Sequence, residues 1–175
     1  MEAGIWYSSA DMKTRSHQVC LLLGSNIEPE VNIPKAMNLL QEKLTFLRVS
    51  SVWESASADC CYPDFLNLAV LVSTPMDAIQ LKEQVLRPLE AQMGRVRTED
   101  KNASRPIDID IILFDGELRD PNLWQHVHRA IPVGEIFPDF CSETGESLKD
   151  IARRLALSTP IQIRKDISIS PLDRT

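Results

Sequence analysis

Hydrophobic and polar positions along residues 18–114 follow patterns that predict four β-strands. Residues 18–24 (QVCLLLG) are almost continuously apolar, as expected for a central strand that is covered on both faces. Residues 46–55 alternate with the two-residue period of a β-strand, so that successive side chains would point to opposite faces of a sheet. Residues 65–73 and 107–114 also have strand-like patterns. Gly24, Ser25 and Asn26 favour a turn directly after the first strand.

A first helix is expected after this turn. Asn32 is suited to cap it, and Pro34 is suited to its first turn. Its amphipathic face is formed with helical spacing by Ala36, Met37, Leu39, Leu40, Lys43 and Leu44.

A second helix is expected after the third strand. Thr74 is a candidate N-cap with Pro75 at the first helical position, and Gly94 is placed for the C-terminal cap. Pro88 lies inside this helix and is expected to kink it. Apolar residues recur every four positions, at Leu81, Val85, Leu89 and Met93.

The resulting order, β-α-β-β-α-β, predicts a ferredoxin-like α+β fold in which helices pack on an antiparallel sheet. Beyond Gly116 we expect a C-terminal extension, with a loop containing Trp124, His126 and His128, a short helix at 147–155 and an edge strand at 161–169. These elements suggest a single domain over residues 17–175, after a disordered leader formed by residues 1–16.

Composition narrows the class of protein. The net charge of −6 argues against a nonspecific nucleic-acid binder, although Arg95, Arg97, Lys101 and Arg105 form a local basic patch. No apolar stretch approaches the ~20 residues that span a membrane, and the N-terminus lacks the apolar core of a signal peptide. The cysteines lack the spacing of a zinc site and indicate reduced thiols in a cytoplasmic protein: Cys20, Cys60, Cys61 and Cys141.

The last predicted strand carries two acids. Asp108 and Asp110 alternate with isoleucines at 107, 109 and 111, so both carboxylates should lie on one face, with Cα atoms roughly 6–7 Å apart. Mg²⁺ takes oxygen ligands and shares them with substrate phosphates, whereas solvated acids on a half-exposed strand are the alternative interpretation. Arg105, just upstream, offers a planar set of donors suited to phosphate.

The segment from Lys101 to Ile112, with Ala103, Ser104, Arg105 and the two acids, closely resembles the signature of the 6-hydroxymethyl-7,8-dihydropterin pyrophosphokinase family. Four other stretches are similar to family elements: residues 23–26 (LGSN), 49–55 (VSSVWES), 63–67 (PDFLN) and 94–97 (GRVR). Together they extend over roughly residues 18–116 in the family's order.

This resemblance implies transfer of diphosphate from ATP to the hydroxymethyl group of 6-hydroxymethyl-7,8-dihydropterin, leaving AMP, in folate biosynthesis. It implies two Mg²⁺ ions held by Asp108 and Asp110, with Arg95 and Arg105 as catalytic residues that clamp the transferred group. The implied ATP contacts are Glu90, Arg97, Lys101, Arg105, Ile111 and His126. His128 is the rival of His126, and a solvated helix face is the alternative for Glu90.

The resemblance also implies a pterin site. Phe65 would stack on the flat ring, Asn67 would bind its edge, and Ser55 would add a hydroxyl contact. The resemblance implies a second aromatic residue on the other side of the ring, for which Trp124 and Phe137 are both candidates.

Two alternative functions remain at this point. The remodelled loop 120–132 suggests a relative with the same fold and chemistry that acts on a modified pterin or another hydroxymethyl substrate. A non-catalytic nucleotide-binding domain is suggested by Asn102 and Ser104, where many family members have Trp and Pro.

Overall fold

The computed structural model describes residues 16–56, 63–96 and 103–169. In these ranges a seven-stranded antiparallel sheet has the order β6-β5-β1-β4-β3-β7, and β2 also pairs with β4. The strands are β1 (His17–Ser25), β2 (Thr45–Val49), β3 (Trp53–Ser55), β4 (Phe65–Thr74), β5 (Asp108–Phe114), β6 (Glu117–Leu118) and β7 (Ile161–Ile163).

The predicted ferredoxin-like core is confirmed. With β2 and β3 taken as one interrupted strand, the central order is β5-β1-β4-β2/β3, and every pairing is antiparallel. Helix α1 (Pro29–Gln41) connects β1 to β2, and a helical segment formed by α2 (Ala78–Leu81), a π-helical turn (Lys82–Leu86) and α3 (Arg87–Gln92) follows β4.

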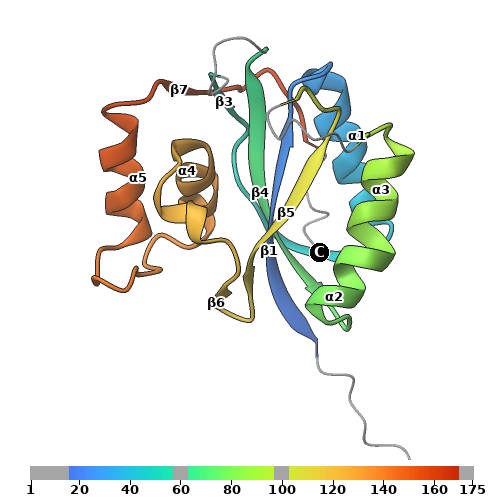
Figure 1. Ribbon diagram of the computed structural model, residues 1–175, viewed down its shortest axis with the longest axis horizontal. Coiled ribbons are helices and arrows are strands. Elements are labelled where there is room, and N and C mark those ends of the chain that lie inside the picture. Colours follow the sequence, from blue (N-terminus) through green and yellow to red (C-terminus); the bar gives the residue numbers. More distant parts are fainter. Residues whose placement is uncertain (1–15, 57–62, 97–102, 170–175) are drawn as a thin grey trace, which may run out of the picture.

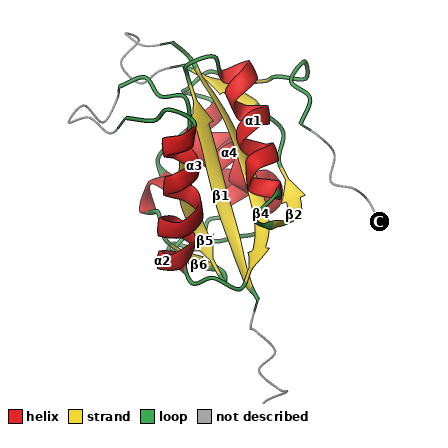
Figure 2. Ribbon diagram, turned by 90° about the vertical axis from the view of Figure 1, so that its right-hand side faces the viewer, coloured by secondary structure: helices red, strands yellow, loops and turns green. Residues whose placement is uncertain are grey.

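Helices cover both faces of the sheet (Figure 1). The view in Figure 2 has α1 and α3 in front of the sheet and α4 behind it. The helices on the second face are α4 (Val127–Ile136) and α5 (Leu148–Ala156). Strand β1 lies between two apolar cores: Val19, Leu21 and Leu23 face α1 and α3, whereas Cys20 and Leu22 face α4 and α5. The prediction that this strand is covered on both faces is therefore confirmed.

The predicted continuous strand over 46–55 is wrong, because it breaks between β2 and β3. The end of α4 docks at this break. Arg48 donates to the carbonyl oxygen of Ile136 at 2.8 Å. The Glu135 carboxylate accepts from the Ser51 backbone N–H at 2.6 Å and from Trp53 Nε1 at 2.9 Å. The break thus supplies the contacts that hold α4 over the sheet.

Both predicted helix starts need correction. Helix α1 begins at Pro29, which takes the first-turn position, and Pro34 lies inside the helix. Asn32 is not its cap; its side-chain amide instead donates to the Ile27 carbonyl oxygen at 2.7 Å. Helix α2 begins at Ala78 rather than at residue 75, because Asp77 and Gln80 form a reciprocal capping box there.

Pro88 does accompany an irregularity, although it takes the form of a π-helical turn. The Arg87 backbone N–H donates to the carbonyl of Lys82, five residues back, which widens the turn directly before the proline. Gly94 ends the segment with a φ of 88°, as its predicted capping position requires.

The C-terminal extension is more regular than predicted. The expected loop contains a 3₁₀ turn (Pro121–Trp124) and the ten-residue helix α4. The helix expected at 147–155 is confirmed as α5, capped by Ser147, whereas the edge strand shrinks to Ile161–Ile163. The predicted leader lies outside the described residues except for Ser16. Among the described helices, none is long and apolar enough to cross a membrane.

A β-bulge interrupts the pairing of β5 with β1. Cys20 pairs with Leu113 and Leu21 pairs with Ile111, so Ile112 has no opposite residue. Upstream of this bulge Ile109 packs in the core formed with α1 and α3, and downstream Phe114 packs in that same core. The bulge therefore fixes which face each residue of β5 presents.

Candidate active site

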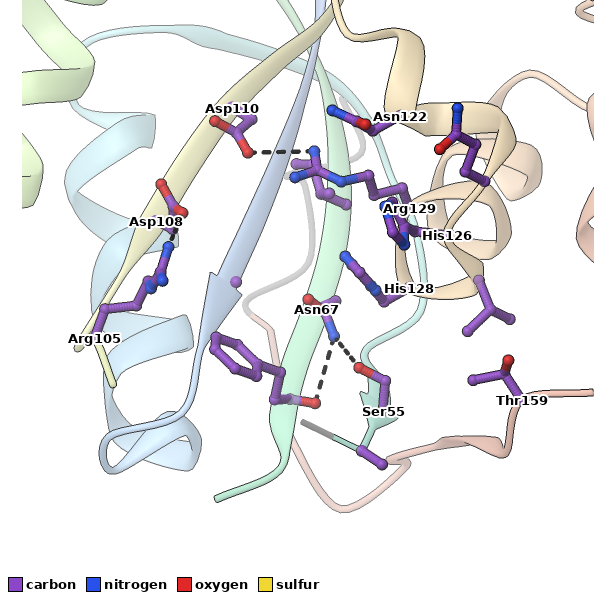
Figure 3. Close-up of a pocket in the computed structure, with 16 residues that line it drawn as sticks. Ser55, Asn67, Arg105, Asp108, Asp110, Asn122, His126, His128, Arg129 and Thr159 are labelled. Atoms are coloured by element: carbon purple, nitrogen blue, oxygen red, sulfur yellow. Dashed lines mark hydrogen bonds and ion pairs between the residues drawn. The ribbon is translucent and has the colours of Figure 1, made fainter. Parts of the chain in front are cut away.

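Asp108 and Asp110 lie on the cavity side of β5, as their alternation with isoleucines predicts. Ile107 and Ile109 are buried in the core on the opposite face. The two carboxylates border a cavity of about 580 Å³ between the sheet and the start of α4. Figure 3 shows residues of β3, β4 and β5 facing His126, His128 and Arg129 across this cavity.

Two arginines bind the Asp108 carboxylate. Arg105 Nη1 donates to Asp108 Oδ2 at 2.8 Å, and Arg95 Nη1 donates to Oδ1. Burial alone would raise the pKa of Asp108, but the charges and hydrogen bonds of Arg95 and Arg105 outweigh it, and the pKa is lowered. Asp108 is thus held as a carboxylate between the two predicted catalytic arginines.

Glu90 forms a buried ion pair with Arg95. Its side chain is only 5% exposed, so the solvated helix face considered from sequence is wrong. Its carboxylate accepts from Arg95 and, at 2.9 Å, from the backbone N–H of Ile109. Glu90 therefore links the helical segment, Arg95 and β5.

Asp110 has a different environment. Its partner is Arg129, whose Nη1 lies 3.3 Å from Asp110 Oδ2 and also pairs with Asp120. Burial and the nearby Asp108 and Asp120 charges raise the pKa of Asp110, while Arg129 opposes this. Three carboxylates thus share a small volume, and Asp110 is the one with the weakest compensation.

The three predicted pterin-binding residues come together in the same cavity. Asn67 Nδ2 donates to Ser55 Oγ at 3.0 Å, and Phe65 lines the cavity beside them. The Arg105 guanidinium carbon lies 6.0 Å from the centroid of the Phe65 ring. Gly24 leaves room for this packing, because a Cβ atom there would lie 3.3 Å from Asn67 Oδ1 and would crowd the amide.

The histidines line the cavity, whereas the proposed second aromatic walls do not. Trp124 stacks on Phe140 with ring centroids 5.5 Å apart, and Phe137 packs in the same core beneath α4 and α5. The rings of His126 and His128 lie 5.4 Å apart. Burial, helped by the Arg129 and His126 charges, lowers the pKa of His128 to about 4, so its imidazole is neutral at physiological pH.

A second cavity, of about 520 Å³, lies along the outer edge of β5. It contains Ile111, one of the predicted ATP contacts, and it shares Asp110, Asn122 and Arg129 with the first cavity. The two spaces therefore meet at Asp110. The remaining predicted ATP contacts, Arg97 and Lys101, lie outside the described residues.

The loop that carries Arg105 is fastened to the end of β1. Asn26 is 2% exposed, and its Oδ1 accepts from the Arg105 backbone N–H at 2.7 Å. Its Nδ2 donates to Ser104 Oγ at 3.3 Å. This predicted turn residue thus positions one of the two arginines that bind Asp108.

Sequence reasoning missed Arg129 and Asp120. A signal for Arg129 lay in its helical spacing to the buried residues Val133 (i, i+4) and Ile136 (i, i+7), because a charged side chain on the buried side of a helix needs a partner. Asp120 carried no comparable signal, because its function depends on a side chain nine residues away.

The residues present fit a magnesium ion that is completed by a substrate. Among the described side chains, no cluster of three or more His, Cys, Asp or Glu could hold a metal on its own. Asp108 and Asp110 supply carboxylate oxygens on one face, and Mg²⁺ in such sites takes its other ligands from phosphates and water. A cation beside Asp110 would also relieve the charge repulsion that raises the pKa of this residue.

The fold and site together define a ferredoxin-like α+β domain with an arginine-lined pair of carboxylates, the chemistry that suits magnesium-bound phosphates. Residues 20–138 match the 7,8-dihydro-6-hydroxymethylpterin-pyrophosphokinase family. The chain belongs to this family.

Its relatives include longer proteins of folate synthesis. The folic acid synthesis protein FOL1 of Dictyostelium discoideum is 30% identical over 152 residues, which cover 81% of this chain and 22% of that protein. The mitochondrial folate synthesis bifunctional protein of Pisum sativum is 32% identical over 110 residues, covering 61% of this chain and 21% of its own length. The chain thus spans about a fifth of the curated relatives it matches.

A solved structure shares the fold. The structure described as HPPK-DHPS in complex with substrates aligns with a TM-score of 0.62 at 14% sequence identity. The alignment covers 82% of this chain and 44% of that one. At this level of identity the likeness supports the fold alone.

Proposed function

We propose that this chain transfers diphosphate from ATP to the hydroxymethyl group of 6-hydroxymethyl-7,8-dihydropterin, producing AMP, in folate biosynthesis. The observation that carries the proposal is the meeting of two cavities at Asp110, one lined by Phe65 and Asn67 and the other by Ile111. A transfer reaction between two substrates requires this kind of adjoining space, because the reacting atoms must be held in line.

The pterin occupies the first cavity. Asn67 offers an amide to the ring edge, Ser55 holds that amide in place, and Phe65 supplies an aromatic face. ATP occupies the second cavity, with its base near Ile111 and its phosphates directed toward Asp110. His126, at the rim of the first cavity, is placed on the phosphate side with Arg129.

Asp108 and Asp110 would hold two Mg²⁺ ions together with the ATP phosphates. When bound, such ions would supply positive charge that neutralises the phosphates. Arg95 and Arg105 leave their contacts with Asp108 for oxygens of the transferred diphosphate, and Glu90 keeps Arg95 in place during this exchange. Arg97 and Lys101 are proposed as further phosphate contacts.

A non-catalytic nucleotide-binding domain is less well supported, because Arg95, Arg105, Asp108 and Asp110 are assembled in one site. A modified pterin remains compatible with the same cavity. We further propose that the protein acts in the cytoplasm, although the relative from Arabidopsis thaliana is a mitochondrial protein by name. Cell fractionation with an antibody against the chain tests this location.

The activity is tested by incubating the 175-residue chain with ATP, Mg²⁺ and the reduced pterin, and separating the nucleotides by chromatography. We expect AMP and the pterin diphosphate in equal amounts, and a loss of at least about a hundredfold in turnover for Asp110→Ala. Asp139→Ala, which removes an exposed carboxylate outside the site, is the matched control. Formation of ADP, or equal turnover in both variants, would reject the proposal.

A further inference from the structure

Arg129 stands where the two cavities meet. It extends from the first turn of α4 toward Asp110, as Figure 3 shows, and it borders both cavities. Its side chain is 19% exposed. Its Nε is buried and has no hydrogen-bond partner among the described residues. A buried donor without an acceptor is costly, so this geometry is suited to a ligand that supplies one.

Arg129 and a divalent cation compete for the same carboxylate. Arg129 Nη1 lies 3.3 Å from Asp110 Oδ2, one of the two oxygens that Asp110 offers to a metal ion. Two cations on the same carboxylate oxygen repel each other. A metal ion bound to Oδ2 would therefore displace the guanidinium from Asp110.

Asp120 determines where Arg129 goes. Its side chain is 15% exposed and its two oxygens have separate tasks. Oδ1 accepts from the backbone N–H of Asn122 at 3.0 Å and from its side-chain amide at 2.9 Å, which fixes the carboxylate on the 3₁₀ turn. Oδ2 binds Arg129. An arginine released by Asp110 thus stays attached to a rigid anchor.

We propose that Asp120 is a positioning residue that retains Arg129 at the junction when a metal-bound polyphosphate takes Asp110, so that the guanidinium passes from carboxylate to phosphate oxygens. Arg129 is then a counter-ion of Asp110 in the ligand-free site and a phosphate ligand in the loaded one. The inference rests on the proposed function for the identity of the polyphosphate.

Binding measurements test this without turnover. Mn²⁺ alone is titrated by electron paramagnetic resonance, and a non-hydrolysable ATP analogue with Mg²⁺ is titrated by calorimetry. For Arg129→Gln we expect Mn²⁺ to bind several-fold more tightly, because its competitor is removed, and the analogue to bind about tenfold more weakly. A Mn²⁺ affinity that is unchanged or lower would overturn the competition.

The double variant isolates the positioning role. Asp120→Asn keeps an acceptor for Asn122 but loses the charge, and it should weaken analogue binding by about fivefold. If Asp120 acts through Arg129, adding Asp120→Asn to Arg129→Gln should cause no further loss of affinity for the analogue. If the double variant instead loses affinity by the product of the two single-variant factors, the proposal is overturned. Asp120→Glu should restore most of the affinity. Asp139→Asn, at an exposed carboxylate that lines neither cavity, is the control.

If a variant fails to fold, the retention of Arg129 can still be tested by NMR on the wild-type protein. The Arg129 Nε–H resonance should shift when the Mg²⁺ analogue is added and should become protected from exchange with water. A resonance that moves to the position of a solvated arginine would refute retention. Coupling between Asp120 and Arg129 without AMP formation would reject the proposed reaction alone, and AMP formation without coupling would reject this inference alone.

Discussion

Replacement of Glu90 by alanine is expected to destabilise the protein much more than replacement of Glu83 on the same helical segment. Both glutamates pair with an arginine. Glu83 and Arg87 are 49% and 45% exposed, whereas Glu90 and Arg95 are 5% and 13% exposed. An exposed pair of this kind contributes about 0.3–0.5 kcal/mol.

The cost at Glu90 has two parts. The Ile109 backbone N–H loses its acceptor at 2.9 Å, which costs about 1–3 kcal/mol for a buried donor. Arg95 loses one of two carboxylates, and removal of one partner from a buried pair costs about 3–5 kcal/mol when no other partner remains. Because Asp108 still compensates Arg95, we expect a total of about 3 kcal/mol for Glu90→Ala.

Urea unfolding followed by tryptophan fluorescence measures both variants. Each change is Glu→Ala within a helical segment, so helix propensity affects the two alike. A difference of less than about 1 kcal/mol between the variants would refute the reasoning, since it would mean that water reaches Glu90 as readily as it reaches Glu83.

Two further predictions concern the cavity. Gly24→Ala places a Cβ 3.3 Å from Asn67 Oδ1, so the KM for the pterin should rise about tenfold while the KM for ATP is unchanged; steady-state kinetics with each substrate varied checks this. His128 has a pKa lowered to about 4 in the fold, so stability should be complete above its unfolded pKa of about 6.5 and decline as the pH falls toward about 4. A proton NMR titration gives the pKa, and unfolding of His128→Gln should lack this part of the decline; a midpoint near 6.5 contradicts the burial argument.

The βαββαβ core could be predicted because its signals are local. The strands β1, β4 and β5 are long and strongly apolar or alternating, and such patterns leave few other assignments. The helix starts were less accurate. Thr74-Pro75 is a good local start signal, but the β4 strand continues through Thr74, and the Asp77–Gln80 box begins the helix three residues later.

Helix α4 could not be read with the same ease. Pro132 and Gly134 lie within it, and both residues disfavour a helix interior. The helix forms because tertiary contacts favour it: its apolar stripe packs on the sheet, and its end is held by Arg48 and by the contacts of Glu135. Such contacts join residues more than eighty positions apart, so no window of sequence contains them.

The site residues likewise fall into those that local sequence motifs predict and those that only tertiary structure brings together. Asp108, Asp110, Arg105 and the Phe65–Asn67 strand belong to local motifs, and the structure gathers them in one cavity. The Arg129–Asp120 pair depends on how the extension folds back over the sheet, and only the three-dimensional arrangement reveals it.

The bulge at Ile112 also governs which insertions and deletions in β5 the fold can tolerate. Because side chains alternate along β5, deletion of one residue upstream of the bulge would turn Asp108 or Asp110 into the core against α1 and α3, and would turn an isoleucine toward the cavity. A carboxylate moved into that core without its arginines costs several kcal/mol, a large part of the stability of a small domain. A deletion that shifts the register of this strand therefore prevents folding, rather than producing a folded but inactive protein. Selection for folding alone is enough to preserve the spacing of the two acids.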